Sequence, residues 1–423
     1  MKQSFLFLQG VASPFFARLA DQLTARGHRV ARINFCAGDA LYWGPRPGWS
    51  YRGDITGLHD YLRGHFEQHN FTDLVLFGSR RPVHLPAIAM AEAIGCRVHV
   101  FEEGYVRPNW LTLERGGVNA DSPLPRDPAW YLEVGARLRP QGNGAPVHSD
   151  IRVRAAHDLA YHAANSLNPL FYRGYRTHRP HSAPVEYAGW IRRFSALPRH
   201  QRIDRQRIHD LIAARTRYYL LPLQLNGDTQ ITLNSRYGGM PQLIDSVLRS
   251  FANHAPEESW LVIKNHPLDT GLVPYADQIT ELAAQLGVGS RILYLETGHL
   301  PTLIGHAQGV VTVNSTVGMS ALVHGCPTVA LGTAIYDLPG LTFQGRLDQF
   351  WDKGADPDRR LFRAFRDIVI HTTQINGDFY TGRGIRLAIA GCERFLAVQS
   401  PLQSLLMRYP PDRQMPGARE SGR

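Results

Sequence analysis

Polar side chains that could carry out chemistry stand at the ends of three apolar runs in this sequence. The three places are Glu102–Gly104, Lys264–Pro267 and Asn314–Thr316. In open α/β sheets, ligands bind at the carboxyl ends of parallel strands, where helix N-termini and unpaired backbone N–H groups meet. Two acids, an imidazole and two hydroxyl groups at such edges indicate an enzyme that transfers a group from a phosphate-bearing donor.

The paired acids Glu102 and Glu103 suit the removal of a proton from a hydroxyl acceptor, because a carboxylate can act as a general base. Gly104 follows them, and a glycine allows the chain to turn sharply enough to direct one acid inward. A solvated loop or a helix cap would explain the same residues without catalysis. Their position at the end of a predicted strand favours the catalytic interpretation.

His266 is stiffened by Pro267, and its imidazole could hold a phosphate or protonate a departing phosphate oxygen. Ser315 and Thr316 stand where the next helix is predicted to begin, beside N–H groups that favour an anion. A structural histidine and an ordinary N-cap are the alternatives, and the N-cap is compatible with phosphate binding. The predicted substrate-binding residues here are Lys264, Pro267, Asn314, Ser315 and Thr316.

Three more polar residues, Gln224, Asn226 and Asp228, follow the predicted strand 218–223. Asp228 could bind a sugar hydroxyl or attack an anomeric carbon as a nucleophile. A turn-forming aspartate is the alternative. Gly10 follows the first predicted strand and forms either a nest for substrate or part of a simple helix N-cap. We include Gly10, Gln224 and Asn226 among the predicted substrate-binding residues.

Strands and helices alternate along both halves of the chain, which predicts parallel sheets covered on both faces. The predicted strands are 4–9, 28–35, 73–77, 96–101, 218–223, 260–264, 291–295, 309–313 and 328–331. The predicted helices are 14–26, 55–69, 82–94, 151–167, 202–214, 240–255, 275–286, 299–306 and 317–324. The expected fold class is α/β and GT-B-like, with two Rossmann-like domains that face each other across a cleft.

The length of 423 residues suits two domains. We expect an N-terminal Rossmann-like, acceptor-side domain at 1–195 and a C-terminal Rossmann-like, nucleotide-sugar domain at 196–385. Residues 386–423 are expected to form a C-terminal helix and a disordered tail.

Composition and spacing argue against several classes of protein. The four cysteines are scattered and no metal-ligand spacing appears, so we expect neither a disulfide framework nor a zinc site. No GxGxxG or GxxxxGK[ST] pattern supports a nicotinamide cofactor or P-loop chemistry. No stretch approaches the roughly 20 apolar residues of a membrane span, and the N-terminus does not read as a signal peptide. A cytoplasmic protein is expected.

The formal charge of +10 is concentrated in one segment. Nine arginines lie between Arg173 and Arg207, against Glu186 and Asp204, and aromatic residues are interleaved with them. Such a segment could face an anionic membrane surface. It could also face nucleic acid, which we consider the weaker interpretation. It could also be a solvated connection between domains. We favour the membrane surface and expect no nucleic-acid partner.

Several segments in a fixed order carry a more specific signal. They are FLQGVASPFFARLADQL, FEEGYVRPNWLTLERGGVN, LPLQLNGD, IKNHP, and VNSTVG followed by ALVHGCPTVALG. Together they resemble the capsule polysaccharide biosynthesis family of the KpsS/LipB type, over roughly residues 4 to 350. The resemblance implies a GT-B β-Kdo transferase that uses CMP-Kdo. Its implied acceptor is phosphatidylglycerol or the lyso form, at the inner face of the cytoplasmic membrane, where it begins the linker of capsular polysaccharide.

The resemblance also implies roles for individual residues. The acids, His-Pro and hydroxyl residues are similar to those of bacterial sialyltransferases, which use CMP-activated keto-sugars. Glu103 is the implied acid/base, supported by Glu102, and His266 with Ser315 and Thr316 binds the CMP phosphate. Where the family usually has an aspartate before glycine, this chain has Glu103. Related β-Kdo transferases retain the anomeric configuration, so the resemblance also implies a carboxylate nucleophile. Asp228, which matches the Asp of the family's Gln-x-x-x-Asp pattern, is the predicted nucleophile, and Glu103 is the alternative.

A CMP leaving group needs charge stabilisation at a helix N-terminus rather than a divalent metal, so we expect no cofactor and no metal. The expected partners are the CMP-sugar donor, an anionic phospholipid and other capsule biosynthesis and export proteins. Two alternatives stay open. One is a nucleotide-sugar epimerase on the same architecture, and the other is a non-enzymatic component of capsule export or assembly.

Overall fold

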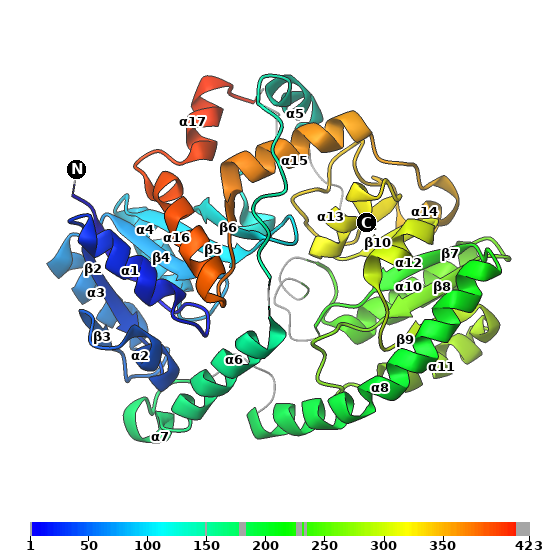
Figure 1. The fold of residues 1–423 in the computed structure, drawn as a ribbon, viewed down its shortest axis with the longest axis horizontal. Coiled ribbons are helices and arrows are strands. Elements are labelled where there is room, and N and C mark those ends of the chain that lie inside the picture. The colour runs from blue at the N-terminus through cyan, green and yellow to red at the C-terminus, as the bar shows by residue number, and fades with distance from the viewer. Residues whose placement is uncertain (1, 149, 177–182, 226–230, 232–234, 412–423) are drawn as a thin grey trace. The chain divides into compact units, whose positions relative to one another are not determined.

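The computed structural model describes residues 2–148, 150–176, 183–225, 231 and 235–411. The chain forms two compact units (Figure 1). Unit 1 consists of Met1–Pro125, Leu138–His178 and Arg366–Pro410, and unit 2 contains Arg126–Arg137 and Arg179–Phe365.

This division differs from the predicted boundaries 1–195, 196–385 and 386–423. The chain returns to unit 1 at Arg366, so residues 386–410 are part of that unit. A short excursion, Arg126–Arg137, belongs to unit 2 although it lies in the N-terminal half. The periodicity of apolar residues predicts helices and strands, but it does not show in which unit each of them packs. The last part of the predicted segment 386–423, residues 412–423, lies outside the described residues.

Unit 1 is built on a seven-stranded sheet in the order β12-β6-β5-β4-β1-β2-β3. Its strands are β1 (Ser4–Phe7), β2 (Arg29–Asn34), β3 (Gly48–Ser50), β4 (Asp73–Phe77), β5 (Arg97–Glu103), β6 (Trp110–Arg115) and β12 (Gln374–Asn376). The strands β1 to β5 run parallel, but β6 pairs antiparallel with both β5 and β12. The expectation of a purely parallel sheet is therefore wrong for this unit, because a tight return after Gly104 brings β6 back beside β5.

Side chains of successive strand residues point to opposite faces of the sheet. Phe5 and Phe7 pack with the buried sides of α1 (Phe15–Ala25) and α16 (Gly382–Leu396). Leu6 and Leu8 point the other way, into a core with α3 (Leu58–His69) and α4 (Leu85–Ala93). Apolar residues on both faces make β1 a continuous hydrophobic run, as expected for a strand buried between two layers of helices.

The remaining helices of unit 1 are α2 (Ala37–Trp43), α6 (Ile151–Asn165), α7 (Asn168–Phe171) and α17 (Pro401–Arg408). No helix or strand is predicted between residues 35 and 55, yet this segment contains α2 and β3. Both are short, and glycine, proline and tryptophan mask their periodicity.

Unit 2 holds a five-stranded parallel sheet in the order β11-β10-β7-β8-β9. Its strands are β7 (Tyr218–Pro222), β8 (Trp260–Lys264), β9 (Ile292–Leu295), β10 (Gly309–Thr312) and β11 (Thr328–Ala330). One face packs on α10 (Met240–His254), α11 (Tyr275–Gln285) and α14 (Leu347–Lys353). The other face packs on α8 (Ala183–Ala213), α12 (Leu300–His306) and α13 (Thr316–Val323). The α/β fold class, with Rossmann-like units, is confirmed. Unit 2 also contains α5 (Pro128–Gly135), and α15 (Arg359–Thr373) begins in unit 2 and continues into the part of the chain that belongs to unit 1.

The first strand of unit 2 lies in the middle of its sheet. The chain goes from β7 to β8 and β9 on one side, then crosses back to β10 and β11 on the other. Such a reversal opens a crevice at the carboxyl ends of the central strands, and that is where α/β proteins bind ligands. The topology of unit 2 therefore directs attention to the ends of β10, β7 and β8.

The basic segment, 173–207, is helical from Ala183 onward, whereas residues 173–176 are not helical. α8 begins at Ala183, well before the predicted start at 202, and runs for 31 residues through Pro198. Arg193 is nearly buried in unit 2, with 9% of its side chain exposed, whereas Arg192, Arg199, Arg202, Arg205 and Arg207 are exposed. Within the described residues, no helix is both long and apolar enough to span a bilayer.

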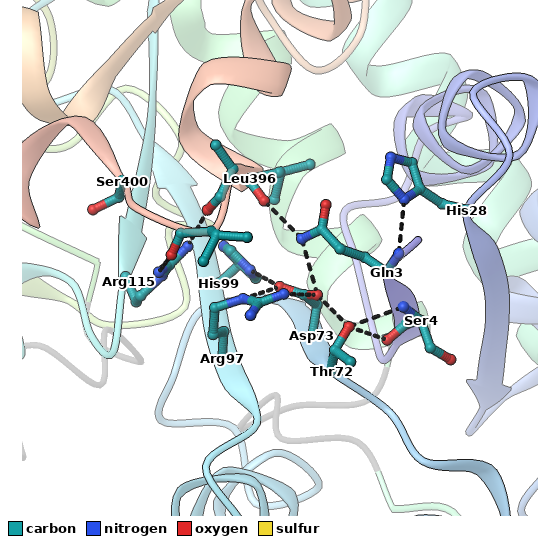
Figure 2. Close-up of polar contacts among 12 residues, drawn as sticks. Gln3, Ser4, His28, Thr72, Asp73, Arg97, His99, Arg115, Leu396 and Ser400 are labelled. Atoms are coloured by element: carbon teal, nitrogen blue, oxygen red, sulfur yellow. Dashed lines mark hydrogen bonds and ion pairs between the residues drawn. The ribbon is translucent and has the colours of Figure 1, made fainter. Parts of the chain in front are cut away.

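A polar network closes the amino-terminal edge of the unit 1 sheet (Figure 2). Asp73, the first residue of β4, is fully buried. Arg97 donates to both of its carboxylate oxygens at 2.8 and 2.6 Å, and Thr72, Gln3 and the His99 ring also bond to it. Burial alone would raise the pKa of Asp73, but hydrogen bonds from His99 and Arg97 outweigh it and lower that pKa to about 2.

Candidate functional site

The carboxyl ends of β7 and β10 in unit 2 are joined by two side chains. Gln224 follows β7 and Asn314 follows β10. The Gln224 amide donates to the Asn314 side-chain oxygen at 3.3 Å, and the Asn314 backbone N–H donates back to the Gln224 side-chain oxygen at 3.4 Å. Both predicted binding residues therefore also fix the distance between the two strand ends.

His266 lies two residues beyond β8, the strand on the other side of β7. Its Nδ1 accepts the backbone N–H of Leu268 at 3.1 Å. A ring nitrogen that accepts cannot carry the proton, so Nε2 holds the hydrogen of the neutral imidazole. This arrangement gives His266 a defined orientation and makes Nε2 a donor, which suits contact with a phosphate oxygen.

Asn265 holds the turn that presents His266. Its side-chain oxygen accepts the His266 backbone N–H at 2.7 Å, and its amide donates to Glu296 at 3.0 Å. Arg193 of α8 donates to the same Glu296 oxygen at 3.3 Å and to the Asp269 carbonyl at 2.6 Å. This bracing, which runs through Arg193 and Glu296, carries no local sequence signal because its members are far apart in the chain.

Lys264 and Pro267 lie on either side of this turn, and they differ in how far they are exposed to solvent. Lys264 is buried, with 7% of its surface exposed, and its ammonium donates to the Asn265 carbonyl at 3.1 Å. Burial and the neighbouring Arg193 guanidinium lower the pKa of Lys264. Pro267 is exposed, and its carbonyl accepts from Arg193. Lys264 is therefore engaged within unit 2 as well as predicted to bind substrate.

Helix α13 begins at Thr316, where the sequence predicts a helix start. Ser315 is its N-cap, and its hydroxyl accepts the Val317 backbone N–H at 3.2 Å. Tyr336 donates to the Ser315 carbonyl at 2.6 Å. A Cβ at Gly318 would lie 2.2 Å from the Tyr336 hydroxyl, so glycine is needed for this close packing. The N-terminus of α13 thus lies at the end of β10, with the hydroxyls of Ser315 and Thr316 beside it.

In unit 1, Glu103 is the last residue of β5. Its side chain is 27% exposed and lies between two guanidinium groups, at 3.4 Å from Arg154 and 4.0 Å from Arg107. The Oε1 atom is shielded from solvent, yet it accepts no hydrogen bond from any described residue. Arg154 contacts this oxygen as an ion pair and not as a hydrogen bond, so the atom keeps the capacity to accept a hydroxyl proton.

Glu102 lies beside Glu103 and accepts the Glu103 backbone N–H at 2.9 Å. A Cβ at Gly104, the next residue, would lie 2.1 Å from the backbone oxygen of Trp110. The glycine is therefore needed for the close approach of β6. The acids are both strand residues, paired with Thr112 and Leu111, and not part of a solvated loop.

Gly10 lies beyond β1, two strands away from the acids. A Cβ at this position would meet the Phe16 ring at 2.7 Å, and the Gly10 carbonyl accepts from Arg81 at 3.1 Å. Arg81 also donates to Gln9. Gly10 thus packs against α1 and anchors an arginine, and its predicted role in binding stays a prediction.

Asn226 and Asp228 lie outside the described residues, so the structure adds nothing on the predicted nucleophile. The described residues contain no group of three or more His, Cys, Asp or Glu side chains that could hold a metal. Within each unit, the other predicted residues do come together. Gln224, Lys264, His266 and Asn314–Thr316 share the edge of one sheet, and Gly10, Glu102 and Glu103 share the edge of the other.

Comparison with known proteins gives the family. The model of the capsule polysaccharide biosynthesis protein family matches residues 72–380. The chain belongs to this family. It is 37% identical over 379 residues to the Escherichia coli protein named capsule polysaccharide export protein KpsS, covering 89% of this chain and 97% of that protein. It is 35% identical to the capsule polysaccharide modification protein LipB of Neisseria meningitidis serogroup B, covering 90% of this chain and 92% of that protein.

A solved structure described as Thermosulfurimonas dismutans KpsC, beta Kdo 2,7 transferase, aligns with 86% of this chain and 89% of its own. The sequence identity is 16% and the TM-score is 0.42. At these values the likeness adds nothing to the argument about chemistry. The predicted membership of the capsule polysaccharide biosynthesis family is confirmed by the family match and the two relatives.

Proposed function

We propose that this protein is a glycosyltransferase that moves Kdo from CMP-Kdo to a phosphatidylglycerol-type lipid and thereby begins the linker of capsular polysaccharide. The observation that carries the proposal is the edge of the unit 2 sheet. Three adjacent strands end there in Gln224, His266 and Asn314, and the helix α13 begins beside them. Backbone N–H groups at a helix N-terminus and an imidazole donor form a suitable site for a single phosphate.

In this proposal the donor's phosphate binds at the N-terminus of α13, with His266 donating from Nε2. Charge develops on the departing phosphate oxygen as the bond to the sugar breaks, and fixed donors stabilise that charge. Asp228 attacks the anomeric carbon and displaces CMP, which leaves a covalent sugar ester. No metal is required, because the leaving group is a monoester whose charge the helix and imidazole can balance.

The second step uses the edge of the unit 1 sheet. The acceptor hydroxyl gives its proton to Glu103 and attacks the anomeric carbon, and the ester bond to Asp228 breaks. Two displacements restore the original anomeric configuration. The buried Oε1 of Glu103, which accepts no hydrogen bond from the described residues, supports this role.

Surface features of both units support a membrane-bound acceptor and a peripheral position at the inner face of the cytoplasmic membrane. In unit 1, α6, α7 and the two-residue connection between them expose large apolar side chains: Leu159 is 59% exposed, Leu167 48%, Leu170 65% and Phe171 50%. In unit 2, α8 exposes five arginines together with Ile191 and Phe194. Apolar side chains beside arginines are typical of surfaces that bind anionic lipid.

The direct test supplies CMP-Kdo, generated in situ, with and without phosphatidylglycerol or its lyso form. We expect CMP release and a lipid heavier by one Kdo in the mass spectrum. Both should be lost in Asp228→Ala and His266→Ala and kept in His209→Ala, which removes an exposed imidazole from α8 of the same unit. A folded protein that binds CMP but modifies no lipid would reject this donor and acceptor pair.

Metal independence is tested in the same assay. We expect the rate of CMP release to be unchanged by EDTA. Activity that disappears with EDTA and returns with magnesium would contradict the proposed leaving-group chemistry.

The name of the Escherichia coli relative, an export protein, favours a second candidate, a non-enzymatic component of capsule export. Such a protein would still support capsule assembly in cells after Asp228→Ala and His266→Ala. An epimerase, the other alternative, would act without lipid and would not release CMP. The same two variants and the same product analysis therefore separate the three functions.

A further inference from the structure

Two arginines beside Glu103 are held in an unusual way. Arg107 follows β5, and Arg154 lies on α6. Their side chains are 51% and 42% exposed, and their contacts with Glu103, at 4.0 and 3.4 Å, are ion pairs rather than short hydrogen bonds. Each guanidinium has five N–H donors. Among described residues, Arg107 also donates to the Gly104 carbonyl at 3.4 Å, and no hydrogen bond from the Arg154 guanidinium is found.

Three other arginines of unit 1 are each held at two points by a carboxylate. Arg97 makes two hydrogen bonds to Asp73, Arg46 makes two to Asp21, and Arg80 makes two to Asp121. Paired, two-point contact is how a guanidinium satisfies a carboxylate. Arg107 and Arg154 face a carboxylate without this geometry, so most of their donors are available to a ligand.

Arg154 is nevertheless fixed in place. Its guanidinium lies over the Tyr380 ring, 4.9 Å from the centroid. The helix that carries it is tied to α2 by Asn165, which accepts the Gly38 N–H at 2.8 Å, and by a hydrogen bond between Tyr42 and His157. Burial and the nearby Glu103 raise the pKa of Tyr380, so its hydroxyl stays neutral beside the acids. A guanidinium oriented in advance loses less entropy when it binds.

We propose that Arg107 and Arg154 form a phosphate-binding site, which holds the phosphate of the acceptor so that its hydroxyl reaches Glu103. This inference rests on the proposed function for the identity of the acceptor. A phosphate presents oxygens around a tetrahedral centre and accepts guanidinium forks from two different elements at once, whereas a carboxylate is satisfied by one fork. The two arginines come from the segment after β5 and from α6, which suits the tetrahedral group.

The charges around the site agree with an anionic ligand. Two positive charges, on Arg107 and Arg154, face the single negative charge of Glu103. The second acid, Glu102, has its own basic neighbour, Arg81. Glu102 and Arg81 both line the space beside Gly78, at 3.8 and 3.9 Å from a Cβ built there. A further acid, Asp158, lies near Tyr380 and also within 3.6 Å of His162. The guanidinium groups of Arg107 and Arg154 therefore leave a net positive charge beside Glu103, which an anionic ligand would balance.

The test measures binding directly in the full-length protein. The soluble probes are glycerol 3-phosphate and glycerol, and the membrane probes are vesicles of phosphatidylglycerol and of phosphatidylcholine. The variants are Arg154→Gln, Arg107→Gln and Arg154→Lys, with Arg152→Gln as the matched control, because Arg152 is an exposed arginine on the same helix. CMP binding is measured in every variant to report on the fold of unit 2, and urea unfolding reports on the whole chain.

We expect Arg154→Gln and Arg107→Gln each to weaken binding of glycerol 3-phosphate about tenfold or more, since a charge-assisted hydrogen bond is lost. Arg154→Lys should restore part of the affinity, and Arg152→Gln and CMP binding should be unchanged. Phosphatidylglycerol vesicles that bind better than phosphatidylcholine vesicles, with the same dependence on Arg154, would identify a lipid as the source of the phosphate. Binding of glycerol 3-phosphate without that preference would identify a soluble phosphate ester.

Equal affinity for glycerol and glycerol 3-phosphate would overturn the inference, and so would equal losses in Arg152→Gln and Arg154→Gln. Different results would reject the proposed function and the proposed phosphate site. Phosphate binding that depends on both arginines, in a protein that transfers no sugar, would reject the transferase alone. Sugar transfer with phosphate binding unaffected by either arginine would reject the phosphate site alone.

Discussion

Two carboxylates of unit 1 stand at opposite edges of one sheet and are held in opposite ways. Asp73 begins β4, is fully buried and bonds through both oxygens to Arg97, with His99, Thr72 and Gln3 around it (Figure 2). Glu103 ends β5, and its Oε1 is shielded from solvent without a hydrogen bond from any described residue. The amino-terminal edge is satisfied internally, whereas the carboxyl-terminal edge leaves bonding capacity for a ligand.

The contrast between Asp73 and Glu103 distinguishes a charged group that stabilises the fold from one that is available to bind a ligand. A buried ion pair is stable only when its hydrogen bonds are complete, and the Asp73 network meets that condition. A site that binds a ligand must leave donors and acceptors open until the ligand arrives. The arginines show the same contrast, because Arg97 is paired at two points whereas Arg154 is not.

The largest expected effect breaks the network at the amino-terminal edge. Asp73→Ala leaves Arg97 and His99 without their acceptor, and removing one partner of a buried ion pair costs about 3–5 kcal/mol. We expect a loss of this size in the free energy of unfolding, measured in urea. Asp60→Ala, at an exposed aspartate of α3 that pairs with Arg63 at the surface, should stay within about 1 kcal/mol of the wild type. Equal effects would remove the contrast between buried and exposed carboxylates.

The Asp73 network should also make the free energy of unfolding depend on pH, because protonation of Asp73 and His99 is linked to folding. The pKa of Asp73 is lowered to about 2 from 3.8, so its contribution of about 2 kcal/mol is present above pH 4 and is lost as the pH falls toward 2. Burial lowers the pKa of His99 below 6.5, despite the opposing Asp73, so stability also falls as the pH drops below 6.5. Urea unfolding from pH 7 to 3 measures both.

Asp73→Asn provides the control for this pH dependence. It should flatten the acid part of the curve, because an amide does not titrate. An unchanged slope below pH 4 in this variant would show that other carboxylates cause the acid lability.

A smaller effect extends the comparison to the sheet of unit 2. His266 is at the carboxyl-terminal edge, where we expect function rather than stability. His266→Ala should weaken CMP binding about tenfold, the loss expected for one charge-assisted hydrogen bond to phosphate. The free energy of unfolding should change by less than about 1 kcal/mol. Binding by calorimetry and unfolding in urea on the same samples would show whether the two effects separate.

Much of this fold follows from local patterns in the sequence. β4 and β8 occupy the predicted residues 73–77 and 260–264, because buried parallel strands are continuous apolar runs with clear ends. The short elements α2 and β3 were hidden by glycine and proline. The antiparallel β6 and the return of Arg366–Pro410 to unit 1 depend on contacts between distant segments, and local periodicity contains no information on those.

The site follows the same rule. The residues at strand ends, such as His266 and Ser315, could be predicted because the edge of a parallel sheet is defined by the strands themselves. Arg154, Arg193 and Tyr380 could not be predicted, since each reaches its partner from a helix or loop far away in the chain. Glu296, which braces the turn of His266, was missed for the same reason.

Glu103→Gln tests the central claim, that the carboxyl-terminal edge of unit 1 is functional, most directly. The glutamine keeps the size of the side chain but cannot accept a proton. We expect transfer of Kdo to lipid, followed by mass spectrometry, to fall at least about 100-fold, with the free energy of unfolding within about 1 kcal/mol of the wild type. Full transfer activity in Glu103→Gln, or a loss of stability as large as that of Asp73→Ala, would contradict the account.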